Sequence, residues 1–296
     1  MKPIKGAGKK IETIQKDNVS ISIDSLGAKV LAIAIRGENL LHYDGKNIEH
    51  SGIPICLPFF SSLENGLLIV DGENYPMGHH GFFRNSEFEM YNTGGKIVAI
   101  LKSSRDTMKI WPFQFNFRAT FSMLENGLKM DFLLKNEDTK AMKLAPGFHP
   151  YFAVNDRNKI TLTSGAVMGN DALHDLKETP LKESGVFDVS DGKEGLKYLR
   201  VKNAPNIQLI HHQVQDTEIC TGPQSMVVLS ADMDLFTRMT VWRPNPDVDF
   251  ICVEPSFAVN AVNRDDCIVL QSGEEFRTTL SIQKKNKKVA SKKNLF

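Results

Sequence analysis

The strongest constraint on the fold is a strict alternation of apolar and polar residues between positions 113 and 134. Apolar residues take every second position, and the same pattern returns after an Asn126-Gly127 pair. The apolar set is Phe113, Phe115, Phe117, Ala119, Phe121, Met123, Leu128, Met130, Phe132 and Leu134. A period of two indicates β-strands with one buried face, and Asn-Gly favours a tight hairpin turn. The segment therefore predicts a β-hairpin within a large sheet that is packed on one side.

Strand patterns recur along the rest of the chain. The expected strands are Val19–Asp24, Lys29–Ile35, Leu67–Val70, Glu73–Met77, Ile97–Leu101, Ile160–Thr163, Ser225–Ala231, Met239–Trp242, Phe250–Glu254, Cys267–Gln271 and Phe276–Ile282. Gly52–Phe60 is apolar but contains Pro54 and Pro58, so we expect an extended segment with bends. Helical periodicity is limited to at most a short turn at Asp171–Glu178.

These patterns predict an all-β fold, with residues 1–296 forming one large β-sandwich domain. No linker, repeat or shift in composition divides the chain. The segment Lys284–Phe296 is basic and lacks an apolar face. We expect it to be a frayed, solvated end rather than a specific binding element.

The composition excludes several classes of protein. There are 36 Lys and Arg residues against 35 Asp and Glu, so the net charge of +1 gives no reason to expect nucleic acid as a partner. The N-terminus lacks the apolar core of a secretory signal, and no run reaches the roughly 18 apolar residues of a membrane span. The four cysteines form no CxxC pair, and Cys56, Cys252 and Cys267 lie in apolar runs. We expect reduced thiols in a cytoplasmic protein with no membrane partner.

The segment Tyr75–Phe88, YPMGHHGFFRNSEF, is the first candidate for a binding site. His79, His80 and Arg84 supply side-chain donors among aromatic residues and glycines, which suits a polar ligand. The alternative is that these histidines only satisfy local backbone groups. Of the two, His80 directly precedes the Gly81-Phe-Phe-Arg84 run, whereas His79 is expected to be a structural neighbour.

Three later positions carry groups suited to proton transfer or binding. His149 lies in PGFHPYF, where Pro150 biases it to extended geometry at the end of an irregular strand. Glu254 follows the apolar residues FICV, and burial there raises the pKa of a carboxyl and makes it a base near neutral pH. The alternatives are a core histidine and a strand-end carboxylate facing water. Asp216, between polar residues and a predicted strand, is a weak signal when taken alone.

Other chemistries lack their motifs. His79-His80 and His211-His212 occur without HExxH or Cys/His spacing, so the sequence predicts no metal site. A GxSxG segment, a Gly-rich phosphate loop and a dinucleotide fingerprint are also missing. A histidine and a glutamate from distant strands, with His and Arg donors nearby, suit proton transfer on a polyhydroxylated substrate without a cofactor.

Five segments, in order, resemble the motifs of the aldose 1-epimerase (galactose mutarotase-like) family. HHGFFRNSEF is similar to the HGFxR motif, PGFHPYF to the HPYF segment and FICVEPSF to the CxEP segment. SLGAKVLAI near the start and QSGEEF near the end also match the pattern. The resemblance covers Val19–Ile282, and the short spacings with a DTEI segment are similar to a compact bacterial-type branch.

The resemblance implies a large two-sheet β-supersandwich with the active site in a groove on one sheet. It also implies interconversion of the α and β anomers at C1 of a sugar. By this resemblance Glu254 takes the proton of the C1 hydroxyl and His149 protonates the ring oxygen, after which the C1–C2 bond rotates and the roles reverse. Trp242 would offer an apolar face to the sugar, with core packing as the alternative. The implied substrate-binding residues are His80, Arg84, Asp216 and Trp242.

Two positions depart from the family pattern. The family usually has an arginine that reaches substrate oxygens where this chain reads Ser61-Ser62-Leu63. Losing such a charge-assisted hydrogen bond costs about 1.5–3 kcal/mol. Ser51 stands where the hexose-6-phosphate branch tends to place a phosphate-binding arginine. Both differences weaken a sugar-phosphate interpretation and leave room for altered substrate choice.

Three hypotheses follow. The first is an aldose 1-epimerase that acts, as a monomer or homodimer, on a free sugar as its small-molecule partner. The second is a carbohydrate-binding or regulatory protein that keeps the groove but has little turnover, because the usual arginine is missing. The third is a hexose-6-phosphate 1-epimerase, which needs a basic phosphate pocket.

Overall fold

The alternating segment forms the predicted hairpin, but its two-residue turn is Glu125-Asn126 and not Asn126-Gly127, because Gly127 pairs with Leu124. In the computed structural model, which describes residues 6–157, 160–171, 178–180, 186–188, 206–222, 225–258, 262–264 and 266–285, it comprises β10 (Phe115–Leu124) and β11 (Gly127–Asn136). Phe117 pairs with Leu134 and Phe121 with Met130 in an antiparallel register. Their side chains are buried while the intervening residues are half-buried or exposed, so one face of this hairpin carries the core.

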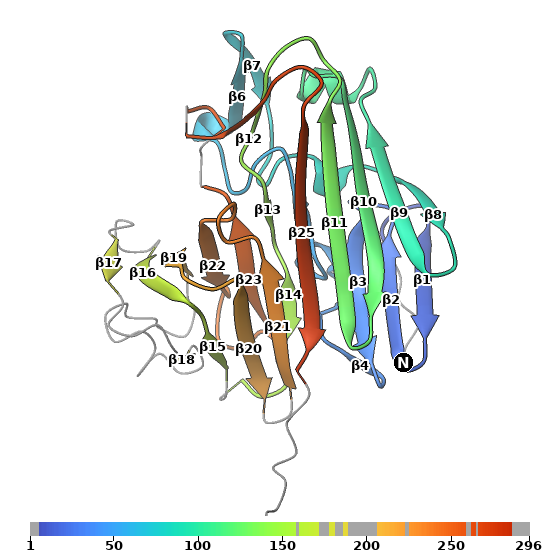
Figure 1. Cartoon of the computed structure of the whole chain (residues 1–296), viewed down its shortest axis with the longest axis vertical. Helices are drawn as coiled ribbons and strands as arrows, with labels where there is room; N and C mark the ends of the chain where they lie inside the picture. The colour runs from blue at the N-terminus through green and yellow to red at the C-terminus, as the bar shows by residue number, and fades with distance from the viewer. Residues whose placement is uncertain are drawn as a thin grey trace, which may run out of the picture.

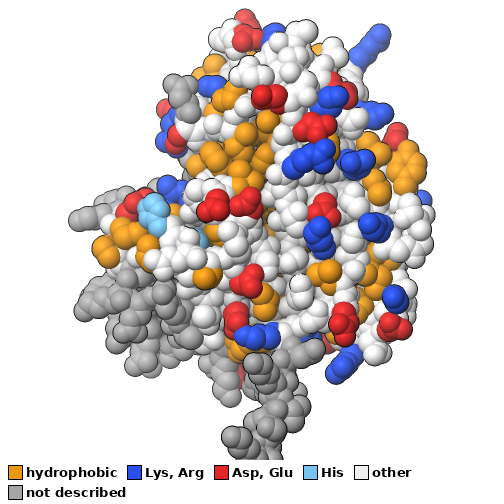
Figure 2. Space-filling view, viewed as in Figure 1, with side chains coloured by type: hydrophobic (Ala, Val, Ile, Leu, Met, Phe, Trp, Pro, Cys, Tyr) orange, Lys and Arg blue, Asp and Glu red, His pale blue; other side chains and the backbone are white. Residues whose placement is uncertain are grey.

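The hairpin lies in the middle of a nine-stranded antiparallel sheet (Figure 1). The order is β18 (Val186–Asp188), β15 (Thr161–Thr163), β20 (Asp216–Gly222), β21 (Ser225–Ala231), β25 (Glu275–Lys284), β11, β10, β9 (Lys96–Lys102) and β8 (Glu89–Asn92). Figure 2 shows Lys and Arg side chains interspersed with Asp and Glu over the face of this sheet. Charges of both signs are typical of a solvated outer face.

The second large sheet has eight strands, and it carries most of the candidate site residues. The order is β17 (Thr179–Pro180), β16 (Ala166–Asp171), β19 (Asn206–His212), β22 (Arg238–Trp242), β23 (Phe250–Ser256), β13 (Gly147–Phe148) and β5 (Ile55–Cys56), with β14 (Tyr151–Ala153) also paired to β23. Every residue of β23 is buried. A strand buried on both faces has one face in the core and the other covered by further structure.

Smaller elements complete the fold. A four-stranded sheet holds β1 (Ile11–Lys16), β2 (Val19–Asp24), β3 (Lys29–Ile35) and β4 (Glu38–Asn39). Two-stranded sheets pair β6 (Leu67–Val70) with β7 (Glu73–Pro76), and β12 (Met142–Leu144) with β24 (Ile268–Leu270). The short helical turns are η1 (Ile48–His50), η2 (Glu64–Gly66), η3 (Phe83–Asn85) and α1 (Thr107–Ile110). None of the helices in the described residues has the length and hydropathy needed to span a bilayer.

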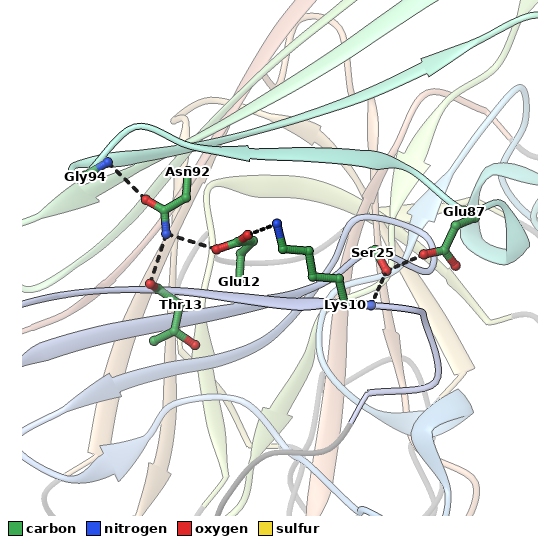
Figure 3. A network of polar contacts seen from close by, with 7 residues as sticks. All are labelled: Lys10, Glu12, Thr13, Ser25, Glu87, Asn92 and Gly94. Carbon is green, nitrogen blue, oxygen red and sulfur yellow. Dashed lines mark hydrogen bonds and ion pairs between the residues drawn. The ribbon is translucent and has the colours of Figure 1, made fainter.

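Polar contacts tie β1 to β8 across a sheet boundary (Figure 3). The Asn92 amide donates to the Glu12 carboxylate at 3.1 Å and to the Thr13 carbonyl at 3.3 Å. The same amide oxygen accepts from the Gly94 N–H at 3.0 Å. Asn92 thereby links the edge of the nine-stranded sheet to the four-stranded sheet.

Aromatic contacts join the two large sheets. Phe132 on β11 lies 4.6 Å, between ring centroids, from Phe148 on β13. Phe83, which is fully buried in η3, lies 5.1 Å from Phe117 on β10. Burying one such side chain stabilises the fold by about 1.5–3 kcal/mol. The predicted two-sheet β-supersandwich is therefore confirmed, and its aromatic core lies between the sheets.

The structure bears on three further expectations, for the C-terminal segment, for the turn at 171–178 and for the cysteines. Strand β25 includes Lys284, so ordered structure continues past the residue at which we placed the start of a frayed tail, and residues 286–296 lie outside the described residues. Asp171 ends β16, and residues 172–177 of the expected helical turn also lie outside them. No disulfide joins the four cysteines in the part of the chain that the structure describes; Cys56 and Cys252 are buried, whereas Cys267 is half-buried in spite of its apolar run.

Candidate active site

A cavity of about 580 Å³ opens on the face of the eight-stranded sheet that points away from the core. Strand residues form its floor: Asn206, Gln208, Thr240, Trp242 and Glu254, together with His149 and Tyr151 at the neighbouring segment. Turns and loops form its walls: Glu49, His50, Phe60, Ser61, His79, His80 and Arg84. Four histidine and two glutamate side chains lie among these fourteen residues, so the cavity is polar and suits a ligand with many hydroxyl groups.

Strand register places the floor residues in two rows. Gln208, Thr240 and Glu254 are paired directly across β19, β22 and β23. Two residues after Thr240 on β22, Trp242 pairs with Cys252 on β23, and Cys252 also pairs with Tyr151 on β14. Because side chains alternate between faces with a period of two, both rows point to the cavity, while Val241 and Val253 point to the core.

His149 is fixed by its neighbours on both sides. Its backbone N–H donates to the Pro54 carbonyl at 3.1 Å, and the preceding Phe148 is buried in the core. Its ring stacks on Tyr151, with 4.6 Å between centroids and 18° between planes. The Nε2 atom then lies 3.4 Å from Oε1 of Glu254. An imidazole and a carboxyl group from segments about one hundred residues apart in sequence therefore meet at the floor.

Burial changes the proton affinities of this pair in opposite directions. Burial raises the pKa of Glu254 well above its usual range, and burial together with the Arg84 charge lowers the pKa of His149 to about 3. Both shifts disfavour charge on the separate groups. The pair consequently holds one proton across the neutral range, so that one member is an acid while the other is a base. Among the described residues, no hydrogen-bond partner meets Nδ1 of His149 or Oε1 of Glu254.

His80 is held with one nitrogen facing the protein. The Ser61 N–H donates to its Nδ1 at 3.0 Å, so Nε2 carries the proton of the neutral ring and is the donor left for a ligand. Burial and the neighbouring His149 lower the pKa of His80, which keeps the ring neutral. The His80 ring lies edge-on to His149 at 5.1 Å between centroids.

Gly81 allows the chain to bring His80 to this position. Its φ is +72°, and a Cβ added there would lie 2.0 Å from the Leu57 carbonyl oxygen, which already accepts from the Phe82 N–H. Only glycine suits so close an approach. The buried Phe83 then anchors the segment to the core, and the Arg84 guanidinium reaches the cavity, 3.7 Å from Glu49.

Comparisons with known proteins agree with this geometry. The sequence model of the family described as Aldose 1-epimerase matches residues 9–283. The chain belongs to the aldose 1-epimerase family. It is accordingly an isomerase of the epimerase type.

Individual relatives are more distant. A curated Cenchrus ciliaris protein named "Putative glucose-6-phosphate 1-epimerase" is 26% identical over 268 residues, which are 83% of this chain and 75% of that protein. A solved structure of a Synechocystis sp. PCC 6803 protein has a TM-score of 0.80 at 18% identity and covers 96% of this chain and 99% of its own. That of a galactose mutarotase related enzyme from Lactobacillus acidophilus has a TM-score of 0.78 at 19% identity, with 94% and 98% covered. The two structures share the fold.

The structure brings together five of the six site residues that the sequence suggested. The lining of the cavity includes His80, Arg84, His149, Trp242 and Glu254. Asp216 does not line this cavity. This residue begins β20 in the nine-stranded sheet, where its exposed carboxylate accepts from the Ser230 hydroxyl at 2.5 Å. The sequence around Asp216 predicts a strand but does not indicate which of the two large sheets that strand joins.

The positions that depart from the aldose 1-epimerase pattern have clear local contacts. Ser62 is exposed, and its hydroxyl lies 3.0 Å from Nδ1 of His79. Ser51 is fully buried, donates to the Asn47 carbonyl at 3.0 Å and accepts from the Asp44 N–H at 2.9 Å. Ser51 therefore holds the loop before η1 and does not line the cavity.

Several lining residues were missed from the sequence. The tyrosine of HPYF and the polar strand residues had no role in the sequence prediction, and His79, expected to be only a structural neighbour, also lines the cavity. The missed set is Glu49, His50, Phe60, Ser61, Tyr151, Asn206, Gln208 and Thr240. Polar residues two apart in otherwise apolar strands, as in NIQLI and MTVW, are a signal that would have found the floor.

One group in the described residues has the composition of a metal site. Ligand atoms of His149, Cys252 and Glu254 lie within 4.8 Å of one another, and histidine, cysteine and carboxylate are zinc ligands. Burial, however, raises the pKa of the Cys252 thiol and of the Glu254 carboxyl well above their usual ranges. A metal ligand must be deprotonated, so a cation bound here would have to displace the protons of both groups.

Proposed function

We propose that the protein interconverts the α and β anomers of a free aldose by acid/base opening and closing of the sugar ring, in a reducing compartment such as the cytoplasm. The observation that carries this proposal is the 3.4 Å approach of His149 Nε2 to Glu254 Oε1 at the floor of a polar cavity. The C1 hydroxyl oxygen and the ring oxygen are both bonded to C1. Two groups that lie side by side can therefore address both atoms at once.

In the proposed step, Glu254 takes the proton from the C1 hydroxyl while His149 gives a proton to the ring oxygen. The C1–hydroxyl bond becomes a carbonyl, and the bond between C1 and the ring oxygen breaks. Rotation about C1–C2 presents the other face of the aldehyde. Closure returns both protons in the reverse direction, so the enzyme ends in its starting protonation state.

For Glu254 to act as the base, the shared proton must lie on His149. Burial alone favours the opposite arrangement, with the proton on Glu254. Hydrogen bonds from substrate hydroxyls to the unpartnered Oε1 atom would stabilise the carboxylate and move the proton to the imidazole. Because ring opening and ring closure use the pair in opposite senses, both arrangements occur in each catalytic cycle.

Wall residues supply binding in this proposal. The Nε2–H of His80 donates to the oxygen on which negative charge develops, and its ring is fixed by the Ser61 N–H. Trp242, which is half-buried on the floor, offers an aromatic face to the sugar. Arg84 adds a charged donor to the wall.

The test is the rate of anomer exchange for a panel of aldoses, followed by polarimetry and by NMR exchange spectroscopy. We expect Glu254→Gln and His149→Asn each to lower kcat/KM by about 10²–10⁴-fold, because each removes one proton-transfer group. The matched control is His211→Asn, which alters an exposed histidine on β19 outside the cavity lining. Wild-type rates in both floor variants would refute the mechanism. Saturable sugar binding without any rate above the spontaneous background would refute the activity.

A second candidate function is epimerisation of a hexose 6-phosphate. The matched Cenchrus ciliaris protein carries that name, and the Arg84 guanidinium on the wall is a group that phosphate recognition uses. Among the described lining residues, however, Arg84 is the one Lys or Arg, and it faces the Glu49 carboxylate. The ratio of kcat/KM for glucose 6-phosphate to that for glucose separates the two candidates.

A further inference from the structure

The wall that carries Glu49 and Arg84 also borders a second cavity, of about 410 Å³. Glu49, His79 and Arg84 line both cavities, and the second one adds Lys29 and Asn85. The Glu49–Arg84 pair therefore lies between the two cavities.

Lys29 is a buried positive charge behind this wall. Its side chain is 6% exposed, and its ammonium donates to the Ile48 carbonyl at 2.9 Å. No carboxylate in the described part of the chain lies within ion-pair distance of it. Burial and the neighbouring Arg84 charge lower the pKa of Lys29 to about 8, so most of it is protonated at pH 7. The Lys29 ammonium and the Arg84 guanidinium therefore both border the second cavity.

Glu49 supplies the counter-charge at this point. Its Oε1 lies 3.7 Å from Nη2 of Arg84, and its side chain is 74% exposed, whereas that of Arg84 is 10% exposed. An ion pair so exposed contributes little to folding stability. Its carboxylate nevertheless takes the position from which an anionic ligand would contact Arg84. Lys29 meanwhile holds the η1 turn that carries Glu49, through the Ile48 carbonyl.

We infer that Glu49 sets the charge class of the substrate: its carboxylate neutralises the positive wall, so that the site favours neutral aldoses over sugars bearing a phosphate or carboxylate group. This inference rests on the proposed function and adds a specificity-determining residue to it. A sugar phosphate that reached Arg84 would have its dianion close to the Glu49 carboxylate. At about 5 Å in a water-like dielectric, that repulsion lowers affinity about tenfold.

The experiment compares kcat/KM for glucose and for glucose 6-phosphate in the wild type, in Glu49→Gln and in Glu73→Gln. Glutamine keeps the size and polarity of the side chain, and Glu73 is an exposed acid on β7 outside both cavities. We expect Glu49→Gln to raise the ratio of glucose 6-phosphate to glucose activity about tenfold, and the gain to shrink at high ionic strength. Glu73→Gln should leave the ratio at the wild-type value. An unchanged ratio in Glu49→Gln, or a wild type that already favours the phosphate ester, would overturn the inference.

A second measurement separates this inference from the proposed function. Inorganic phosphate binding, followed by Trp242 fluorescence or calorimetry at low salt, requires no turnover. Tighter phosphate binding by Glu49→Gln than by the wild type, by about tenfold, supports the role of Glu49 even if no sugar is epimerised. Equal phosphate affinity of the two proteins overturns it even if epimerisation is fast.

Discussion

The two large sheets use the same strand geometry for different purposes. In the nine-stranded sheet, buried phenylalanines alternate with half-buried or exposed polar residues, so one face packs and the other is solvated. In the eight-stranded sheet, β23 is buried on both faces, and its cavity-facing residues include Glu254. The second sheet thus buries a titratable carboxyl group, whereas the buried polar residues of the first, such as Asn136 and Thr217, are uncharged. Burying a group that can carry a charge costs more free energy than burying a neutral polar group, so this cost falls on the eight-stranded sheet, which also carries the cavity.

The comparison of the two sheets also shows that burial alone does not determine the role of a residue. Phe121 and Glu254 are both almost fully buried. Phe121 contacts other core side chains, whereas Oε1 of Glu254 has no hydrogen-bond partner among the described residues. We therefore expect substitutions in the two sheets to divide cleanly between stability and catalysis.

The largest effect is expected from Phe121→Ala on β10. Removing this buried ring leaves a cavity in the core and should lower the free energy of unfolding by about 3–5 kcal/mol. The active-site cavity lies on the other sheet, so kcat/KM per folded molecule should stay at the wild-type value. Urea unfolding followed by circular dichroism, with Phe121→Leu as a milder control, measures the first quantity. Loss of activity in the folded fraction would show that the two sheets are not independent.

A smaller effect is expected from Trp242→Ala on the cavity floor. Loss of an aromatic face for the sugar should cost about 0.5–1.5 kcal/mol of binding and raise KM about three- to tenfold, with kcat changed less. Trp242→Phe keeps an aromatic ring and should recover most of the affinity. Trp242 also packs on Tyr151 and Phe250, so the melting temperature is measured alongside. A KM at the wild-type value in Trp242→Ala would assign this residue to packing alone.

The smallest effect is expected from Asp216→Asn. The family resemblance implies that this acid binds substrate hydroxyls, but in the structure it lies on the nine-stranded sheet beside Ser230. We expect kcat/KM within about twofold of the wild type, since a surface substitution away from the site changes little. Steady-state kinetics on the best aldose measures this. A loss of tenfold or more would restore the role that the family pattern suggests.

Strand alternation made much of the fold predictable from the sequence. The Phe115–Leu124 and Gly127–Asn136 pair follows from a period of two, although its turn lies one residue earlier than the predicted Asn126-Gly127 pair, and Ser225–Ala231 has the bounds that its pattern gave. The start at Phe115 instead of Phe113, and the end of β25 at Lys284, depend on tertiary contacts that local pattern does not encode.

The site was only partly predictable. His80, His149 and Glu254 were identified because each lies in a short motif with a chemical purpose. Glu49 lies on a three-residue turn whose position depends on the Lys29 ammonium, and that contact spans distant elements. Asn206 reaches the floor through its pairing with Trp242, thirty-six positions later in the chain. Such residues are recognisable only after the register between strands is known.

The two walls of the cavity differ in how freely they can change. The Gly81–Arg84 wall is fixed by a carbonyl that leaves no space for a side chain at position 81, and by a phenylalanine in the core. The η1 turn is held by the Lys29 ammonium and by Ser51, and it presents the exposed Glu49 carboxylate. His50 on this turn stacks on the floor residue Tyr151, whereas Glu49 is exposed, so we expect substitution of Glu49 to leave the floor and the core intact. We therefore expect the substrate range of this protein to change through position 49, while Gly81 and Phe83 keep the opposite side of the cavity in place.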